Sequence, residues 1–412
     1  MSGIGEHLQD GDPLGGDPQS ALSQFGFRIQ HVSSISNFGI TLFLGASRVP
    51  PASTRHPADH PLQGSFAGMS KTNTGNFFED FTVGQVIEHA TPRTVTEGDR
   101  AVYGSLYPSR FAVPSSASFA ASVGLDPHPV EELIGFHIAF GKTVPDISLN
   151  AVANLGYAEC RFHTPVVPGD TLCTRSTVIG LKQNSNGKSG VVYVRSVATN
   201  QRDEVAIEWA RWVMVHKRDL EASAPETVIP DLAKVVDPAD LVIPTGLDFT
   251  DYDSVAAGEP HRFDDYEVGE RIDHVDGVTL TDPEHMLATR LWQNTAKVHF
   301  NTQARPDGKR LVYGGHIISM ARALSFNGLA NAQLISAINA GAHASPAFAG
   351  DTVYAWSEVL DKAETSAPGV GALRLRLVGT KDRDESMTLR GEDGKYAPGV
   401  LLDLDVWALI PR

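Results

Sequence analysis

The sequence has few cysteines, an excess of acidic over basic residues, and no long apolar run. Its two cysteines, Cys160 and Cys173, are too few for a disulfide framework and are expected to be buried, inert thiols of a reducing compartment. The 34 Lys and Arg residues are outnumbered by 49 Asp and Glu residues, which gives a formal net charge of −15. This balance argues against a nucleic-acid partner, because phosphate binding rests on clustered Lys and Arg.

Segments that would direct the chain to a membrane are also missing from the sequence. No stretch approaches the roughly 18 apolar residues that a helix needs to cross a bilayer, so no membrane partner is predicted. The first residues do not have the basic start and apolar run of a signal peptide. We therefore expect a cytoplasmic protein, and 42% hydrophobic with 20% charged residues is typical of a soluble globular chain.

The chain has 412 residues, which is enough for two domains and extra segments. Residues 1–68 are rich in Gly, Pro, Ser and His, and we expect them to form a largely disordered N-terminal extension. Met69 begins a more ordinary N-terminus, so an upstream start codon is one explanation of the extension. The folded part is expected to begin there.

An internal repeat divides the remaining residues into two copies. Three blocks return in the same order, namely Phe78–Gly84 as Phe263–Gly269, Asn150–Asn154 as Asn327–Asn331, and Pro165 with Gly169–Thr171 as Pro346 with Gly350–Thr352. The displacement is 185 residues for the first block (263 − 78) and 181 for the last (346 − 165). Matches that keep their order with small drifts indicate a duplicated domain.

Each copy has the pattern of a β-rich segment, a mostly apolar helix and then several strands. In the second copy a run that opens at Gly314 and Gly315 has an apolar face at helical spacing. The residues of this face are Ile317, Met320, Ala321 and Leu324. Runs rich in β-forming residues follow the helices, such as Val191–Val197, Ala206–Val215 and Leu401–Leu409.

An antiparallel sheet wrapped around a central helix and present twice in one chain is the α+β double-hotdog architecture. We expect the first hotdog in residues 69–221 and the second in residues 258–412. Residues 222–257 contain repeated Pro and Asp with little periodicity, which predicts a linker on the surface.

Five unusual strings lie within these copies, namely Phe78–Asp99, Gly141–Ser148, Gln293–Asn301, Tyr313–His316 and Ala349–Trp356. They resemble the mesaconyl-CoA hydratases of the wider MaoC-like dehydratase group, over about residues 75–412. The resemblance implies a hydro-lyase that reversibly hydrates mesaconyl-CoA to β-methylmalyl-CoA, a step in acetyl-CoA assimilation. It also implies an acyl-CoA substrate, a homodimer, and no cofactor or metal.

The resemblance points to a catalytic pair in the second copy. Hydrating a conjugated thioester requires a held water, a group that takes and returns a proton, and donors for the enolate oxygen. Related (R)-specific hydratases use an Asp and a His separated by four residues, and this chain has Asn294 and His299 at the matching place. Imidazole titrates near neutral pH, so His299 is the predicted acid–base residue. Outside this motif, a His between Val298 and Phe300 is more often structural.

Asn294 departs from the related pattern, because an amide orients water but does not usefully accept a proton. Mesaconyl-CoA carries a free carboxylate beside the carbon that is hydroxylated, and our hypothesis is that an Asp at 294 would repel it whereas Asn donates a hydrogen bond. A second carboxylate is then a candidate for part of the acid–base role. Asp146 is one candidate, although a position at a helix start after Pro145 is the commoner explanation.

Gly314 is the predicted oxyanion donor, because a helix N-terminus presents unpaired N–H groups and a partial positive charge. Two adjacent glycines also mark tight turns, and the family pattern 15 residues after His299 (314 − 299) supports the functional interpretation. Cationic candidates for the substrate carboxylate and the CoA phosphates are Arg110, Lys297, Arg305, Lys309 and Arg310, none of them preferred.

The first copy is expected to have lost the catalytic pair. At the displacement of 185, Asn294 and His299 correspond to Ser109 and Pro114, neither of which is an acid or base near neutral pH. We therefore expect one active site per chain, with the first copy shaping the acyl-CoA pocket.

His137 and His316 match at a displacement of 179 (316 − 137), and a structural role is expected for both. Neither has a second His or Cys at ligand spacing, so no metal site is predicted. No dinucleotide fingerprint, phosphate loop or Gly-x-Ser-x-Gly elbow is present.

Three other functions compete with the predicted one. A broader (R)-specific enoyl-CoA hydratase or 3-hydroxyacyl-CoA dehydratase would share the chemistry. A hotdog thioesterase would need an acidic residue on the central helix, and residues 316–329 contain none. A non-catalytic acyl-CoA-binding hotdog protein would have lost the pair in both copies.

Overall fold

The computed structural model of the chain describes residues 71–381 and 388–412. Met69–Arg412 form one compact unit, and the predicted disordered extension, residues 1–68, lies outside the described residues. Within the described ranges, no helix has the length and apolar character that spanning a membrane requires.

The first half of the unit has its strands and helices before residue 221. In chain order they are η1 (Phe78–Asp80), β1 (Val86–Thr94), α1 (Glu97–Leu106), α2 (Ala112–Ser115), α3 (Ala117–Ser122), α4 (Glu132–Thr143), the π-helical η2 (Val144–Ser148), β2 (Ala151–Phe162), β3 (Thr171–Gln183), β4 (Ser189–Thr199) and β5 (Val205–His216). Two short helices follow before the second half, η3 (Pro238–Asp240) and α5 (Ser254–Ala257).

The second half repeats this order. Its elements are η4 (Phe263–Asp265), β6 (Arg271–Thr279), α6 (Asp282–Leu291), η5 (Lys297–His299), η6 (Thr302–Ala304), α7 (Gly314–Leu324), α8 (Phe326–Leu329), β7 (Leu334–His343), β8 (Thr352–Glu364), β9 (Val370–Thr380) and β10 (Val400–Pro411). The predicted strand runs fall inside β4, β5 and β10, and the helix predicted to open at Gly314 is α7.

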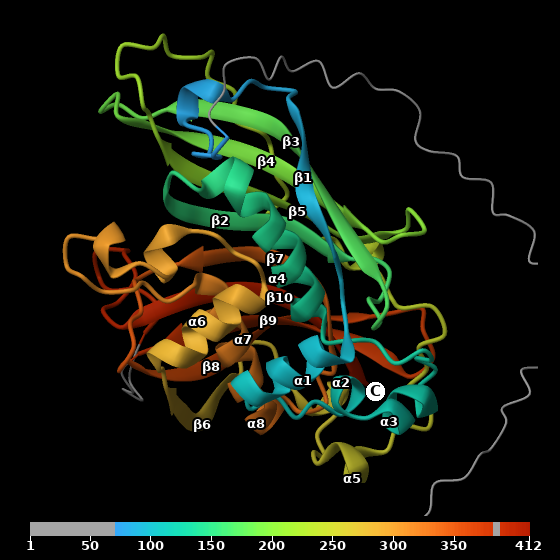
Figure 1. The fold of residues 1–412 in the computed structure, drawn as a ribbon. Helices are drawn as coiled ribbons and strands as arrows, with labels where there is room; N and C mark the ends of the chain where they lie inside the picture. Colours follow the sequence, from blue (N-terminus) through green and yellow to red (C-terminus); the bar gives the residue numbers. More distant parts are fainter. Residues whose placement is uncertain (1–70, 382–387) are drawn as a thin grey trace, which may run out of the picture. The chain divides into compact units, whose positions relative to one another are not determined.

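The described strands form a single antiparallel sheet in the order β1-β3-β4-β5-β2-β7-β10-β9-β8-β6. From one edge to the middle the order is β1-β3-β4-β5-β2, and from the other edge it is the equivalent β6-β8-β9-β10-β7. The two halves therefore meet where β2 pairs with β7. Tyr157 lies opposite Gly341 in that pair, and Cys160 lies opposite Ile338. Figure 1 shows this sheet with α4 and α7 against it. The predicted α+β double-hotdog fold is confirmed.

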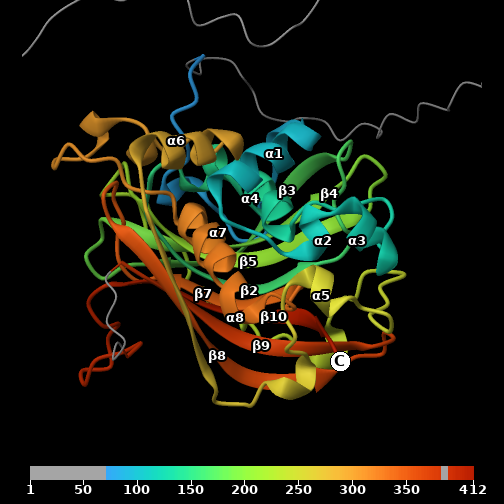
Figure 2. The same cartoon turned by 90° about the horizontal axis from the view of Figure 1, so that it is seen from below.

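The helices gather on one face of the sheet. Figure 2 shows α4 and α7 on this face, with α1 and α6 beyond them, and His137 of α4 contacts Ser319 of α7. Gly141 of α4 permits a close approach between the halves, because a Cβ there would overlap the carbonyl of Trp292. The first half therefore lies directly against the loop that carries Asn294.

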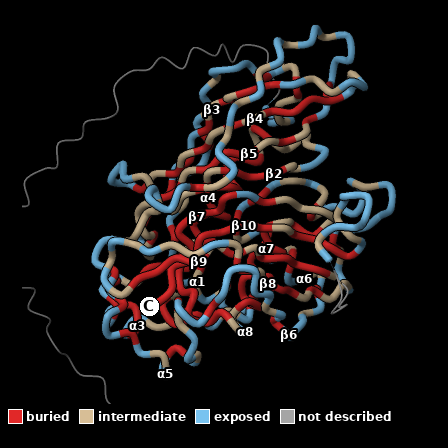
Figure 3. The backbone as a smooth tube through the Cα atoms, turned by 180° about the vertical axis from the view of Figure 1, so that it is seen from behind, coloured by how far each residue is buried: buried red, intermediate tan, exposed pale blue. Residues whose placement is uncertain are grey.

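Local sequence explains how the helices begin. Thr96 and Asp99 form a capping box at the start of α1, and Thr281 accepts a hydrogen bond from the Glu284 N–H at the start of α6. The central helices α4 and α7 are buried almost all round, as expected for helices enclosed by a sheet. Figure 3 shows this buried interior along the central strands and both central helices.

The linker, residues 222–257, was predicted to lie on the surface, and this is wrong for several of its apolar residues, although Ile229 and Val255 are exposed. Val236, Leu247, Phe249 and Tyr252 are buried in a cluster that also contains Trp407 of β10. The indole N–H of Trp407 donates a hydrogen bond of 3.0 Å to the Val236 carbonyl. These residues are widely spaced without period, so no helix or strand pattern reveals their burial.

The repeat between residues 150–154 and 327–331 does not hold in the structure. The first segment leads into strand β2, whereas the second lies in α8 and the turn after it. Asp146 and Asn327 occupy similar places instead: the Asp146 carboxylate accepts a hydrogen bond from the His89 ring, and the Asn327 main-chain carbonyl accepts one from the His274 ring. Their displacement is 181 (327 − 146). The match was a chance likeness of small and polar residues.

Two further expectations need correction. His137 is the sixth residue of α4 and His316 the third of α7, so the two are not equivalent positions. Cys160 is buried as expected, but Cys173 is exposed.

Candidate active site

The three predicted site residues, Asn294, His299 and Gly314, line one cavity of about 390 Å³. All three belong to the second half, and the first half contributes other walls of the same cavity. The structure therefore brings together the groups that the family pattern singled out, next to a space large enough for an acyl group.

His299 ends the short helix η5 and is 8% exposed. Its Nδ1 lies 2.8 Å from the carbonyl oxygen of Leu311. A carbonyl only accepts, so Nδ1 carries the proton and Nε2 of the neutral ring is free to accept one. Burial lowers the pKa of His299 to about 4, against a smaller opposing effect of the Leu311 bond. The ring is therefore a neutral base at physiological pH.

The position of His299 relative to helix α7 is fixed by the backbone. The Leu311 N–H donates to the Val298 carbonyl at 2.9 Å, so the segment before α7 runs beside the histidine. The His299 ring also packs edge-on against Tyr313, with centroids 5.6 Å apart. These contacts hold the imidazole close to the start of the helix.

Asn294 is buried, and its orientation is set by a local turn. Its Oδ1 accepts the Ala296 N–H at 2.9 Å, which leaves the Nδ2 donor as the end available to a ligand. The preceding Gln293 has φ of 52°, an uncommon left-handed conformation for a residue other than glycine. The Lys142 ammonium donates to the Gln293 side chain from α4. The first half thus supports the loop that presents Asn294.

Gly314 is the first residue of α7, and its N–H has no acceptor within the helix. A Cβ at this position would lie 2.5 Å from the ring of His343, so glycine is required by close packing. His343 ends strand β7, lines the cavity and accepts or donates a 3.1 Å hydrogen bond with the Tyr157 hydroxyl. Burial lowers the pKa of His343 to about 4.

The first half brings further residues to the cavity that the repeat and the family pattern do not reveal. They include Phe140, Asn154, Tyr157 and Arg211. For Arg211 a signal was present, since it occupies an alternate position of β5 whose neighbours at the same spacing, Trp209 and Val213, are buried. An arginine within a run of inward positions is unusual.

The candidates in the first half take other roles. Ser109 donates to the buried Glu131 carboxylate at 2.9 Å. Asp146 is in the first turn of η2 and lies 2.7 Å from the His89 ring, and it is not among the residues that line the cavity. Helix α4 runs directly into η2 and Asp146 forms no side-chain cap, so Asp146 does not mark a helix start either; its carboxylate contacts His89 instead.

The cationic candidates separate in the structure. Arg305 lines the cavity and pairs with Asp307 at 2.7 Å. Arg310 pairs with Asp282 at 2.6 Å, and Arg110 stacks over the Phe326 ring. Of these cations only Arg305 is among the lining residues.

His137 and His316 have the structural contacts that were expected. His137 lies 3.0 Å from the Ser319 hydroxyl, and His316 lies 2.9 Å from that of Tyr107. In the part of the chain that the structure describes, no three His, Cys, Asp or Glu side chains come together in a way that suits a metal ion.

Comparisons with known proteins identify a family and close relatives of this chain. The family model described as mesaconyl-CoA hydratase matches residues 65–390. A mesaconyl-CoA hydratase of Cereibacter sphaeroides is 67% identical over 342 residues, which are 83% of this chain and 100% of the relative. A β-methylmalyl-CoA dehydratase of Chloroflexus aurantiacus is 60% identical over 350 residues, which are 83% of this chain and 99% of the relative.

Solved structures give the same result for the fold. A putative MaoC domain protein dehydratase from Chloroflexus aurantiacus has a TM-score of 0.82 and 60% identity, over 84% of this chain and 99% of that one. A double-hotdog protein from Mycobacterium tuberculosis has a TM-score of 0.66 at 24% identity, over 82% of this chain and 98% of that one.

Proposed function

This chain belongs to the mesaconyl-CoA hydratase family, and from that premise we propose that the cavity of its second half is where mesaconyl-CoA is reversibly hydrated to β-methylmalyl-CoA. The chain is a hydro-lyase that acts on a CoA thioester. The observation that carries the proposed site is that a neutral imidazole with a free Nε2 lines the same cavity as the first residue of α7.

The hydration begins at His299. Its Nε2 takes a proton from water while the water oxygen forms a bond to the β carbon. The electrons of the double bond move toward the thioester, and negative charge develops on the carbonyl oxygen. The proton then passes from Nε2 to the α carbon, which restores the thioester and the neutral ring. The step balances without a cofactor beyond the CoA of the substrate.

Gly314 stabilises the charge that develops on the thioester oxygen. Its N–H lies at the N-terminus of α7, where the helix dipole adds a partial positive charge. Because His343 occupies the space where a Cβ would stand, the carbonyl approaches a bare backbone. This donor acts on the transition state more strongly than on the uncharged thioester.

Asn294 holds the water or the substrate through its Nδ2 donor. Its Oδ1 accepts the Ala296 N–H, so the amide presents a donor and no negative charge to the carboxylate of the substrate. This supports the hypothesis that Asn replaces Asp where the substrate carries a carboxylate beside the carbon that is hydroxylated.

The direct test is to incubate the purified protein with mesaconyl-CoA and follow the loss of the conjugated enoyl-thioester absorbance. We expect decay to an equilibrium, with β-methylmalyl-CoA identified by mass, and the same equilibrium reached from the product. Crotonyl-CoA, measured in parallel, separates this function from that of a broader hydratase. A protein that changes neither substrate contradicts the proposal.

A homodimer and a cytoplasmic location are also part of the proposal. The dimer follows from the family resemblance, and light scattering of the purified protein tests it by the mass of the particle. Localisation of a tagged chain in the host tests the compartment.

A further inference from the structure

Arg211 is a buried cation without a carboxylate partner among the described residues. It is 1% exposed, and its guanidinium stacks 4.3 Å from the Phe140 ring centroid. Its Nη2 donates to the Thr143 hydroxyl at 2.8 Å, and its contacts with Asn154 and Ser148 are longer, at 3.5 Å. No ion pair within 4.0 Å involves Arg211 in the described part of the chain.

Two donor atoms at this place have no acceptor within the described residues, Nε of Arg211 and Nδ2 of Asn154. Burying a charge without an opposite charge is costly, so an anionic group of a ligand that reached Arg211 would offset this cost. Burial lowers the pKa of Arg211 to about 10, which leaves the group protonated at neutral pH.

A second buried arginine, Arg322 of α7, is a useful comparison. Its Nε also lacks an acceptor among the described residues, but its Nη2 donates to the carbonyls of Ala332 and Gln333. Arg322 is not among the residues that line the cavity, whereas Arg211 is.

Arg211 belongs to the same cavity as the proposed catalytic groups. It lies directly opposite Tyr157 in the pair of β2 with β5, and the Tyr157 hydroxyl contacts His343, which packs on Gly314. One continuous wall thus leads from the thioester site at the helix start to the guanidinium. Thr143 and Ser148, which hold Arg211, lie in the unusual string 141–148 of the sequence.

We propose that Arg211, assisted by Asn154, binds the free carboxylate of the acyl group and makes the site selective for CoA thioesters of dicarboxylic acids. This inference rests on the proposed function, which places the thioester at Gly314. A planar guanidinium pairs with a carboxylate through two parallel hydrogen bonds, and a buried pair is far stronger than an exposed one. The first half, without a catalytic pair of its own, supplies the specificity of the second.

The test compares two substrates and two variants. Arg211→Met is expected to lose at least ~100-fold in kcat/KM for mesaconyl-CoA and to change crotonyl-CoA hydration by less than ~3-fold. Arg211→Lys keeps the positive charge but not the planar guanidinium. Its kcat/KM for mesaconyl-CoA is expected to lie between those of wild type and Arg211→Met. Arg374→Met is the matched control, because Arg374 is a strand arginine paired with Asp405 and is not among the cavity-lining residues.

A measurement without turnover keeps this inference separate from the proposed function. Succinyl-CoA and butyryl-CoA differ by a terminal carboxylate, and neither has a double bond to hydrate. Wild type is expected to bind succinyl-CoA more tightly, and Arg211→Met is expected to abolish this preference. If the wild-type protein hydrates neither substrate, the proposed function is contradicted. The binding of succinyl-CoA and butyryl-CoA then still tests the role of Arg211.

Two outcomes would overturn the inference about Arg211. If Arg211→Met lowers both hydration rates equally and the melting temperature falls, Arg211 is a clamp for η2 and the inference is overturned. An unchanged preference for succinyl-CoA in Arg211→Met, or in Arg211→Lys where the first variant does not fold, overturns it as well.

Discussion

The central helices of the two halves begin with the same backbone contacts but with different residues. Val130 and Val312 each precede a central helix by two residues and donate to the carbonyls of Val166 and Ala347, at 2.8 and 3.0 Å. At the first helical position, α7 has Gly314 and α4 has Glu132. The place where an oxyanion would bind in the second half is therefore filled by a side chain in the first.

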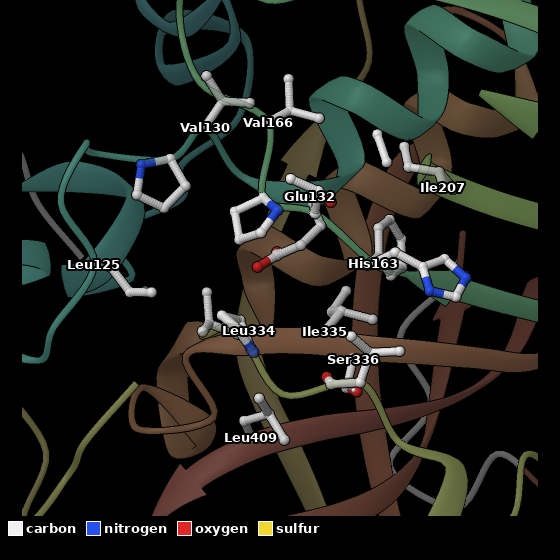
Figure 4. Close-up of a pocket in the computed structure, with 17 residues that line it drawn as sticks. Leu125, Val130, Glu132, His163, Val166, Ile207, Leu334, Ile335, Ser336 and Leu409 are labelled. Carbon is white, nitrogen blue, oxygen red and sulfur yellow. Dashed lines mark hydrogen bonds between the residues drawn. The ribbon is translucent and has the colours of Figure 1, made fainter. Parts of the chain in front are cut away.

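The strands around the two helix starts differ in the same sense. His343 ends β7, whereas Phe162 ends β2 at the equivalent position. The cavity in the first half has a volume of about 40 Å³, against about 390 Å³ in the second. Figure 4 shows the Glu132 side chain extending from the start of α4 into this small pocket, near Leu334 and Ile335.

In the proposed function the two halves divide the work. Residues of β2 and β5 in the first half form walls of the cavity that contains Asn294, His299 and Gly314. They reach this cavity because β2 pairs with β7, which makes the two halves one sheet. Substitutions at equivalent positions of the two halves should therefore have unequal effects.

The largest effect is expected for His299→Ala. General acid–base loss lowers a rate by ~100-fold to 10,000-fold, so kcat for mesaconyl-CoA should fall by this factor. His163→Ala removes a histidine that lines the small pocket of the first half, and kcat should change by less than ~2-fold. Steady-state kinetics decide the matter, and equal losses in both variants would show that the halves share the chemistry.

Exchange of the residues at the two helix starts should give the next largest effect. In Gly314→Ala the new Cβ meets the His343 ring, and the thioester oxygen is displaced from the N–H. We expect kcat to fall by ~10-fold to 100-fold. Glu132→Gly, which gives the first half the residue of the second, should leave kcat unchanged.

The outcome that contradicts this is activity gained in the first half. A His299→Ala protein that recovers rate when Glu132→Gly is added would mean that Glu132 alone blocks a competent site. Phe162 and Ser109 at the other equivalent positions argue against such recovery.

A selective effect of about 10-fold is expected for Asn294→Asp. The new carboxylate keeps the cap on Ala296 but repels the carboxylate of mesaconyl-CoA, so kcat/KM should fall for this substrate. Crotonyl-CoA has no carboxylate, and its rate should hold or rise. Asn301→Asp is the control, because Asn301 likewise accepts the N–H of the residue two positions further on and is not among the cavity-lining residues. A gain in activity on mesaconyl-CoA would show that the repulsion argument is wrong.

The pH profile should show a small effect. Burial holds the pKa of His299 at about 4, so the base stays neutral as the pH falls from 7 to 5.5. We expect kcat/KM to fall by less than ~2-fold over this range, whereas a histidine with the ordinary pKa of ~6.5 would lose most of its neutral form. An acid limb near pH 6.5 in the rate profile would contradict the burial of the ring in the working enzyme.

The sequence alone was sufficient to predict the site residues that lie close together in the second copy. The repeat predicts the duplicated fold. Asn294, His299 and Gly314 line one cavity because all three lie on a short segment around the start of α7. Their proximity is set by nearby backbone contacts such as that of His299 with Leu311. Patterns within a segment are the kind of information that a single sequence carries.

The missed residues depend on contacts between the halves. Arg211 and Tyr157 come from strands of the first half and reach the second site only because β2 pairs with β7. A single sequence holds no record of which strands pair across a duplication. His343 lies at the end of β7, and its contact with Gly314 joins a strand to the start of a helix 29 residues earlier (343 − 314). The apolar linker residues were missed for the same reason, since their partner is Trp407 of the last strand.

The smallest effect concerns stability in the first half. Burial, helped by the charge of Glu131, raises the pKa of Glu132 to about 8 from an unfolded value near 4.5. The folded state therefore holds a proton that the unfolded state releases, so stability is full below pH 4.5 and is lost as the pH rises through 8. Glu132→Gln removes this loss, and its melting temperature should exceed that of wild type by a few degrees at pH 9 and match it near pH 4.5. Thermal melts over this range measure the difference, with kcat unchanged as the control. A difference in melting temperature that does not change with pH would show that the pKa of Glu132 is not raised in the folded state. The Glu132 carboxylate would then be ionised at neutral pH, and the start of α4 would hold an anion, as the start of α7 does in the proposed reaction.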